Sequence, residues 1–374
     1  MPGNAEKKYV RKTNNLFLIL ILLYLALEFF VTLITGRDIE FGITASLILS
    51  QGSLILPALI FIAAERLDIK EWAPFKKIRW STFGLTILFT LCISPFVTLI
   101  NLLSQLFTTN FVAELAEELF SEPPLLMMVM IGVIGPFCEE FTFRGVIFHG
   151  LRKSGRVLAA IIVSALFFGL MHMNLNQFCY AFFLGIAFAL LTEATGSLIP
   201  PITMHLCINS SNIGMEFIAD FLYSSFNGGS EGLAELFSES EVTRDEIFYI
   251  AGIYMIPGLI GLALSIVVFI AICRNEGSLE HIKSLFTKKS TKAAGPALAT
   301  DIPAEAAGPA VTPDMPAVSA GSDVPYGDIH SEDPQIPAIQ KKTPVITASG
   351  WIAIVFCVIV ILASDVVLRL VGNW

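Results

Sequence analysis

Long hydrophobic runs recur along this chain of 374 residues, and short polar stretches separate them. An α-helix needs about 20 consecutive apolar residues to cross the hydrocarbon of a bilayer. Nine runs approach or exceed that length: 14–35, 42–64, 81–104, 124–149, 157–172, 175–192, 197–217, 247–273 and 346–370. The pattern therefore predicts an all-α fold, a polytopic membrane helix bundle with about nine transmembrane helices.

Composition supports the same class, because 55% of the residues are hydrophobic and only 15% are charged. A soluble globular domain carries about 25% charged residues. The net charge of −9 says little about partners, since acidic loops are usual on the exported side of membrane proteins. The sequence has no patch of basic and aromatic residues, so we expect no nucleic-acid partner.

Residues 293–345 differ from the rest of the chain, because they are rich in Pro, Ala, Gly, Ser and Asp and poor in large apolar residues. Such a composition predicts a disordered cytoplasmic linker. The linker leads to a last transmembrane helix in residues 346–374, which could anchor the chain or recruit a partner. The rest divides into N-terminal helices 1 to 3 (1–123), a core (124–217), and an acidic exterior loop, helix 8 and a basic cytoplasmic segment (218–292).

The distribution of Lys and Arg predicts the orientation, because basic residues next to spans are retained on the cytoplasmic side. With a cytoplasmic amino terminus and nine helices, 19 of the 23 Lys and Arg residues lie on that side. Arg37, Arg244 and Arg369 lie on the opposite side, and Arg144 lies within a span. We therefore expect a multi-pass protein of a cell membrane with its amino terminus in the cytoplasm.

Charged residues interrupt the fourth hydrophobic run. An ionised group at the centre of a bilayer costs about 2.5 to 3.5 kcal/mol on insertion scales, so such groups are functional candidates by default. Glu140 and Arg144 are four residues apart and can form an ion pair on one helix face. Glu139 points about 100° away and lacks that partner, which favours a role as general base. The alternative is one ion-pair cluster of all three residues that holds helices together.

Two further polar pairs follow, each one helical turn long. Phe168 and His172 share a face of the fifth helix, and His205 and Asn209 share a face of the seventh. Either pair alone could serve only as an interhelical contact. Glu139 lies roughly 16 Å from the cytoplasmic end of its helix and His205 roughly 12 Å from the start of its own, so their depths are similar. His172 lies roughly 24 Å along its helix. A joint site therefore requires the fifth helix to tilt or to begin later.

Small residues and a proline precede the Glu pair. Gly132, Gly135 and Pro136 permit either a close helix approach or a local bend. Plain packing is the alternative explanation for each of these positions.

These residues carry a resemblance to a known family. Glu139 to Arg144, Phe168 to His172 and His205 to Asn209 resemble the EExxxR, FxxxH and HxxxN motifs of the CPBP intramembrane proteases, in the same order. That family is also called the ABI or type II CaaX prenyl endopeptidase family. The resemblance covers roughly residues 124–217, and it does not extend to the first three helices or to the linker and last helix.

The resemblance implies an intramembrane endopeptidase in which a glutamate activates water against a peptide bond. Glu139 matches the family's catalytic glutamate, and His172 matches the histidine that helps to position the water. His205 and Asn209 match the pair proposed to stabilise the oxyanion. Glu140 and Arg144 match positions that support these groups, and Phe168 opens the second motif. The expected partners are the lipid bilayer and a membrane-associated, lipidated or processed peptide substrate.

A zinc ion is an alternative to this metal-free scheme. Glu139, His172 and His205 would give three ligands and an open position, as a catalytic zinc site requires. The sequence has no HExxH pair on one helix, and the metal-free scheme already gives each polar residue a role. We therefore favour a site without a bound cofactor and keep zinc as the alternative.

Two other classes of function use the same residues. A proton-coupled transporter needs buried Glu and His residues, but transporters usually show internal repeats, and this sequence shows none. A non-catalytic membrane scaffold would recruit partners through the acidic loops or the last helix. Substitution of Glu139 separates the three, because it would abolish proteolysis, abolish transport, or change neither.

Overall fold

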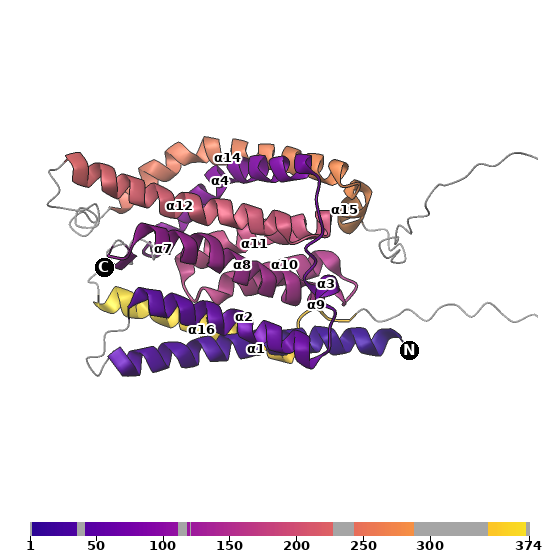
Figure 1. Ribbon diagram of the computed structural model, residues 1–374. Coiled ribbons are helices and arrows are strands. Elements are labelled where there is room, and N and C mark those ends of the chain that lie inside the picture. Colours follow the sequence, from indigo (N-terminus) through magenta and orange to yellow (C-terminus); the bar gives the residue numbers. More distant parts are fainter. Residues whose placement is uncertain are drawn as a thin grey trace, which may run out of the picture. The chain divides into compact units, whose positions relative to one another are not determined.

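The computed structural model describes residues 2–35, 42–110, 118–119, 121–226, 243–287 and 343–371. Within these residues the chain is helical and has no β-strand, which confirms the predicted all-α fold. The long uninterrupted helices are α1 (Pro2–Thr35), α2 (Ile43–Ala64), α4 (Trp80–Gln105), α10 (Val157–Met171), α11 (Leu175–Thr195), α12 (Ile199–Phe226), α14 (Arg244–Asn275) and α16 (Ala348–Val371) (Figure 1). The predicted linker lies outside the described residues, apart from residues 343–345.

Seven helices of the described residues are long and apolar enough to cross a membrane. They are α1, α2, α4, the segment Pro124–Arg152, α11, α14 and α16. The predicted count of nine is not confirmed. Helix α10 has only 15 residues, and α12, although 28 residues long, carries His205, Asn209 and several other polar side chains that lower its apolar character. The chain is therefore a polytopic helical membrane protein in which two of the motif-bearing helices are the atypical ones.

The segment Pro124–Arg152 is helical throughout but changes its winding four times. It runs through α7 (Pro124–Val129), the π-helix η1 (Met130–Ile134), α8 (Gly135–Glu140), the π-helix η2 (Phe141–Phe148) and α9 (His149–Arg152). Short π-helical turns within α-helices are rare and occur frequently at functional sites. Here they lie on both sides of the six-residue helix α8.

Helices α4 and α14 pack closely along their length (Figure 1). Small residues allow this approach, because a Cβ atom at Gly258 would lie 2.9 Å from a methyl carbon of Leu99, and one at Gly261 would clash with the Cys92 carbonyl. Thr86 and Thr90 are buried on α4. Their hydroxyls bond to carbonyls one turn back in their own helix, so they are satisfied without a partner helix.

Helix α16 packs against α1, and a buried polar side chain joins the two ends of the chain. Asn14 of α1 donates through Nδ2 to the Val345 carbonyl at 3.0 Å, and its Oδ1 accepts from the Thr347 backbone N–H at 3.2 Å. Gly350 leaves the space that Asn14 occupies. Both backbone groups come from the residues that lead into α16, so Asn14 fixes where this helix begins.

Candidate active site

Glu139 and Glu140 are neighbours on α8, yet they occupy different environments. The side chain of Glu140 is completely buried, whereas 19% of the Glu139 side chain is exposed. Helix α8 packs against α2 and α12, which turns one carboxylate into the protein interior. The sequence-based expectation that the two residues point in different directions agrees with this arrangement.

Glu140 lies at the centre of a buried ionic network. Its Oε1 accepts from Arg144 Nη1 at 3.0 Å and from His205 Nδ1 at 2.9 Å. Arg144 also donates through Nη2 to the Gly185 carbonyl of α11 at 3.3 Å. Removing one member of a buried ion pair typically costs about 3 to 5 kcal/mol, because the other charge is left uncompensated. The predicted ion pair of Glu140 and Arg144 is therefore present, and Glu140 extends it to a third residue, His205.

Aromatic rings enclose the Arg144 guanidinium. Its central carbon lies 4.2 Å from the ring centre of Phe168 and 4.8 Å from that of Phe188. Phe168 also contacts the His172 ring edge to face, with ring centres 5.2 Å apart. A desolvated cation over an aromatic face gains about 2 kcal/mol or more. Phe168 therefore links the EExxxR motif to the FxxxH motif through its ring.

His205 lies between the two carboxylates. Its Nδ1 donates to Glu140, and its Nε2 faces Glu139 Oε2 at 3.8 Å. The Phe188 ring stacks on the imidazole with centres 4.7 Å apart and planes 22° apart. Because Nδ1 carries a proton, Nε2 is an acceptor in the neutral ring and becomes a donor only in the imidazolium. The hydrogen-bond pattern thus makes the chemistry of Nε2 depend on the charge of His205.

His172 immediately follows α10, and its orientation is fixed by its own helix. Its Nδ1 lies 3.0 Å from the Phe168 carbonyl, which can only accept, so Nδ1 is the donor. In the neutral ring Nε2 therefore carries the lone pair. The Phe168 ring contacts both imidazoles, with its centre 5.2 Å from that of His172 and 5.9 Å from that of His205. The structure thus brings the histidine of the second motif to the site, although its depth along the helix alone did not match.

Asn209 lies one turn after His205, but it contacts a different part of the Glu-bearing segment. Its Nδ2 donates to the Ile131 carbonyl of η1 at 3.2 Å. The neighbouring Ser210 hydroxyl donates to the Gly132 carbonyl at 3.2 Å. One N–H of the Asn209 amide is thus used for a backbone contact, and the second remains for another acceptor.

The three conditional zinc ligands do not form a metal site as they stand. Among the described residues, no group of three or more His, Cys, Asp and Glu side chains is arranged to hold a metal ion. His205 uses Nδ1 for Glu140, and its Nε2 lies 3.8 Å from Glu139 Oε2. The steps proposed below use these side chains alone.

The sequence analysis missed two residues that contribute to the site. Phe188 stacks on His205 and covers Arg144, and Gly185, one turn earlier on α11, supplies the carbonyl that Arg144 contacts. A Cβ atom at Gly185 would lie 2.9 Å from the Ala165 Cα, so α10 and α11 approach closely here. Neither residue is polar, which is why a search for polar residues within spans could not find them.

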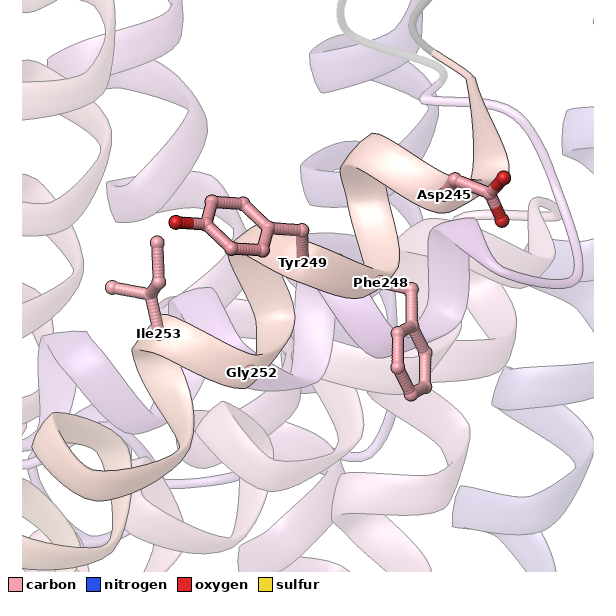
Figure 2. A pocket seen from close by; sticks show the side chains of 5 residues that line it. All are labelled: Asp245, Phe248, Tyr249, Gly252 and Ile253. Carbon is pink, nitrogen blue, oxygen red and sulfur yellow. The ribbon is translucent and has the colours of Figure 1, made fainter.

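A separate depression lies on α14, away from these residues. Asp245, Phe248, Tyr249, Gly252 and Ile253 line an open, largely apolar hollow of about 580 Å³. Figure 2 shows that all five lie on neighbouring turns of one helix. This hollow has a single carboxylate and no imidazole, so it does not combine the groups that meet around Glu139.

Comparison with known proteins identifies the segment that contains the site. Residues 120–211 match the family model described as type II CAAX prenyl endopeptidase Rce1-like. YdiL of Bacillus subtilis (strain 168), whose name assigns it provisionally as a membrane peptidase, is 31% identical over 91 residues, which are 24% of this chain and 37% of YdiL. The membrane-embedded CAAX protease MroQ of Staphylococcus aureus (strain USA300) is 36% identical over 90 residues, covering 22% of this chain and 36% of MroQ.

The resemblance carried by the three motifs is confirmed over this segment, since residues 120–211 include all of them. The match spans just over a third of each relative's length. No solved structure matches the chain. The helices on either side of the segment therefore have no counterpart in these comparisons.

Proposed function

We propose that this chain is an intramembrane endopeptidase that uses Glu139 as the general base. The observation that carries the proposal is the contrast between the two adjacent carboxylates. Glu140 is buried and held by Arg144 and His205, whereas Glu139 is partly exposed and has Oε2 3.8 Å from His205 Nε2. Paired ionisable groups in contrasting environments are the usual way in which a site assigns separate roles to them. The similarity of residues 120–211 to membrane peptidases supports the same function.

The chemistry begins with water held between Glu139 and His172. His172 Nε2 accepts one hydrogen of the water, since its Nδ1 donates to the Phe168 carbonyl. Glu139 takes the other proton as the water oxygen bonds to the scissile carbonyl carbon. The carbonyl π electrons move to oxygen and form a tetrahedral intermediate. The C–N bond then breaks, and Glu139 returns its proton to the leaving amine.

His205 and Asn209 are placed to stabilise the negative charge on that oxygen. His205 can donate from Nε2 as an imidazolium, and Glu140 on its Nδ1 stabilises that positive charge. Asn209 retains one amide N–H beyond the one used for Ile131. Loss of a donor to such an oxyanion typically costs about 3 to 4 kcal/mol in the transition state.

The substrate in this proposal is a peptide bond of a membrane-associated, lipidated or processed polypeptide. The site lies on helices that lie within or cross the bilayer, so the substrate must reach it from the membrane or from its surface. The names of the relatives point to peptidases of this kind, and one of them to CAAX proteolysis.

The proposed orientation places the amino terminus in the cytoplasm. Contacts join several segments that this orientation assigns to the same side of the membrane. Lys12 of α1 pairs with Glu65 after α2, and Lys153 after α9 pairs with Glu71 at 2.7 Å. Arg79 before α4 donates to the carbonyl of the last residue of α14. These pairs join residues that the basic-residue distribution assigns to one face of a cell membrane.

The test compares new peptide termini in membranes that contain the wild type or Glu139→Gln. We expect termini that are present with the wild type and absent with the variant, because an amide cannot accept the proton from water. Glu28→Gln is the matched control, since Glu28 is an exposed carboxylate on the membrane helix α1. It should leave the termini unchanged.

The other possible outcomes of this experiment would support a different function. Identical termini in the wild type and Glu139→Gln, with both proteins folded and abundant, would contradict the protease. Proton-coupled uptake lost in Glu139→Gln would then support a transporter, and no change in uptake would support a scaffold. Treatment of the wild-type membranes with a chelator tests the metal-free scheme, which requires the new termini to persist after metal removal.

A further inference from the structure

The helix that carries Glu139 contains a defect in its hydrogen bonding just before the catalytic turn. The Gly135 N–H bonds to the Met130 carbonyl, five residues back, instead of to Ile131. Pro136 has no N–H, so it cannot bond to Gly132 as an α-helix would require. The carbonyls of Ile131 and Gly132 therefore both lose the donors that a regular α-helix supplies.

Two consecutive residues of α12 supply the missing donors. Asn209 Nδ2 donates to the Ile131 carbonyl and Ser210 Oγ donates to the Gly132 carbonyl, each at 3.2 Å. The absence of a side chain at Gly132 makes this possible, because a Cβ atom there would lie 2.6 Å from Ser210 Oγ. This finding agrees with the close approach that the sequence suggested for Gly132.

The same two helical segments carry the reacting groups. Glu139 is three residues after Pro136, and His205 is five residues before Ser210. Two adjacent hydrogen bonds between the segments fix how far one can slide along the other. A slide would change the 3.8 Å distance between Glu139 Oε2 and His205 Nε2.

We propose that Ser210 is a positioning residue for the reaction. Its hydroxyl holds the Gly132 carbonyl and thereby fixes Glu139 relative to His205, and Pro136 keeps that carbonyl available. Ser210 lies outside the three motifs, and this inference rests on the proposed endopeptidase function.

Ser211 provides an internal contrast to Ser210. Its side chain is exposed, and its hydroxyl bonds to the Ile208 carbonyl of its own helix at 2.9 Å. The two adjacent serines therefore differ in whether the hydroxyl joins α12 to the Glu-bearing segment.

The experiment measures cleavage by the full-length protein with a substrate identified from its termini. Four proteins are compared across pH: wild type, Glu139→Gln, Ser210→Ala and Ser211→Ala. A displacement of reacting groups by about 1 Å can cost on the order of 100-fold in rate, so we expect Ser210→Ala to lower kcat by about 10-fold to 100-fold. KM should stay within about 2-fold, because the hydroxyl does not touch substrate in this proposal. Ser211→Ala should match the wild type.

The pH profile separates positioning from loss of folded protein. A smaller folded fraction lowers the cleavage rate by the same factor at every pH and leaves the midpoints of the pH profile unchanged. An altered distance between Glu139 and His205 shifts the acid-limb midpoint of kcat/KM, because each group contributes to the field at the other. A Ser210→Ala profile with the wild-type midpoint would overturn the proposal, as would a kcat equal to that of Ser211→Ala.

A double-mutant cycle with Pro136→Ala identifies the bond itself. An alanine in place of this proline has a backbone N–H, which the α-helical pattern of bonding four residues back directs to the Gly132 carbonyl. Ser210→Ala should therefore cost at least about 3-fold less in kcat in that background. Equal effects in both backgrounds would overturn the assigned contact. If the wild type cleaves no better than Glu139→Gln, the endopeptidase function fails and the role of Ser210 fails with it. Failure of the Ser210 role alone leaves wild-type cleavage dependent on Glu139.

Discussion

At the residue scale, Glu140 accepts hydrogen bonds from two groups at once, the guanidinium of Arg144 and the imidazole of His205. It holds Arg144 by an ion pair with atoms 3.0 Å apart, and it accepts the Nδ1 proton of His205 at 2.9 Å. The first contact stabilises the fold, because the Arg144 side chain is completely buried. The second contact sets which nitrogen of His205 faces Glu139. Stability and activity therefore depend on different contacts of one carboxylate and can be separated.

Glu140→Gln should lower both stability and activity. Stability falls because Arg144 loses its counter-charge in the interior. We expect a loss of about 3 kcal/mol in the free energy of unfolding. Adding Arg144→Met should restore most of that stability, since no buried charge then remains unpaired, while cleavage stays low because His205 still lacks its carboxylate. Thermal unfolding in detergent and peptide cleavage measure the two quantities. Unfolding of Glu140→Gln at the wild-type temperature would contradict this account.

At the scale of helices, the three motifs were predictable because α-helical geometry is local. A spacing of four residues places Glu140 beside Arg144 and Phe168 beside His172 in a regular α-helix, and the first contact persists although Arg144 lies in the π-helix η2. The contacts between helices were not predictable in this way. Asn209 was expected beside His205 as a second donor to substrate, yet it also bonds to a carbonyl of η1. That acceptor exists only because η1 departs from α-helical winding, and the sequence around Pro136 indicated a bend without specifying which carbonyls it frees.

Lys12 of α1 forms an ion pair with Glu65, which directly follows the span of α2, and this pair gives a pH dependence. The hydrogen bond from Lys12 holds the pKa of Glu65 below its ordinary value of 4.5. Because the folded-state pKa is the lower one, this pair stabilises the fold above pH 4.5, and its contribution is lost as the pH falls through the folded-state pKa. The contribution of such a pair is at most about 1 kcal/mol.

Glu65→Gln should therefore lower the unfolding temperature at about pH 6 and have a smaller effect near about pH 3.5. Unfolding temperatures of both proteins across this range measure the difference. Glu280→Gln is the control, because Glu280 lies on the short helix α15 (Leu279–Phe286) and its side chain is 84% exposed in its pair with Lys283. An equal loss for Glu65→Gln at both pH values would contradict the linkage.

At the scale of the whole molecule, the last helix is joined to the first although 331 residues separate Asn14 from Val345. The composition of residues 293–345 suggested a tether that leaves α16 free to anchor or recruit. The structure places α16 against α1 and gives Asn14 two backbone partners beside it. Sequence patterns could not show this contact, because a single Asn in an apolar helix does not reveal its distant partner. Docking of α16 should therefore depend on Asn14 and not on the connecting chain.

This dependence can be tested by cutting the connection between the two helices. A protease site is inserted within residues 300–330, which the composition predicts to be a linker, and the protein is cleaved after it has folded. The fragment that contains α16 should then remain bound to the rest of the wild-type protein in detergent. In Asn14→Ala it should dissociate, because the Val345 carbonyl and the Thr347 N–H each lose their partner at a cost of about 1 to 3 kcal/mol.

Ser53→Ala is the control for this experiment, since that hydroxyl bonds within its own helix α2 and its loss should leave the fragment bound. Retention of the fragment by Asn14→Ala would show that apolar packing alone holds α16. Release of the fragment from the wild type after cleavage would show that the connecting chain holds it. Only retention by the wild type together with release from Asn14→Ala assigns the docking of α16 to Asn14, because the two proteins then differ in that side chain alone.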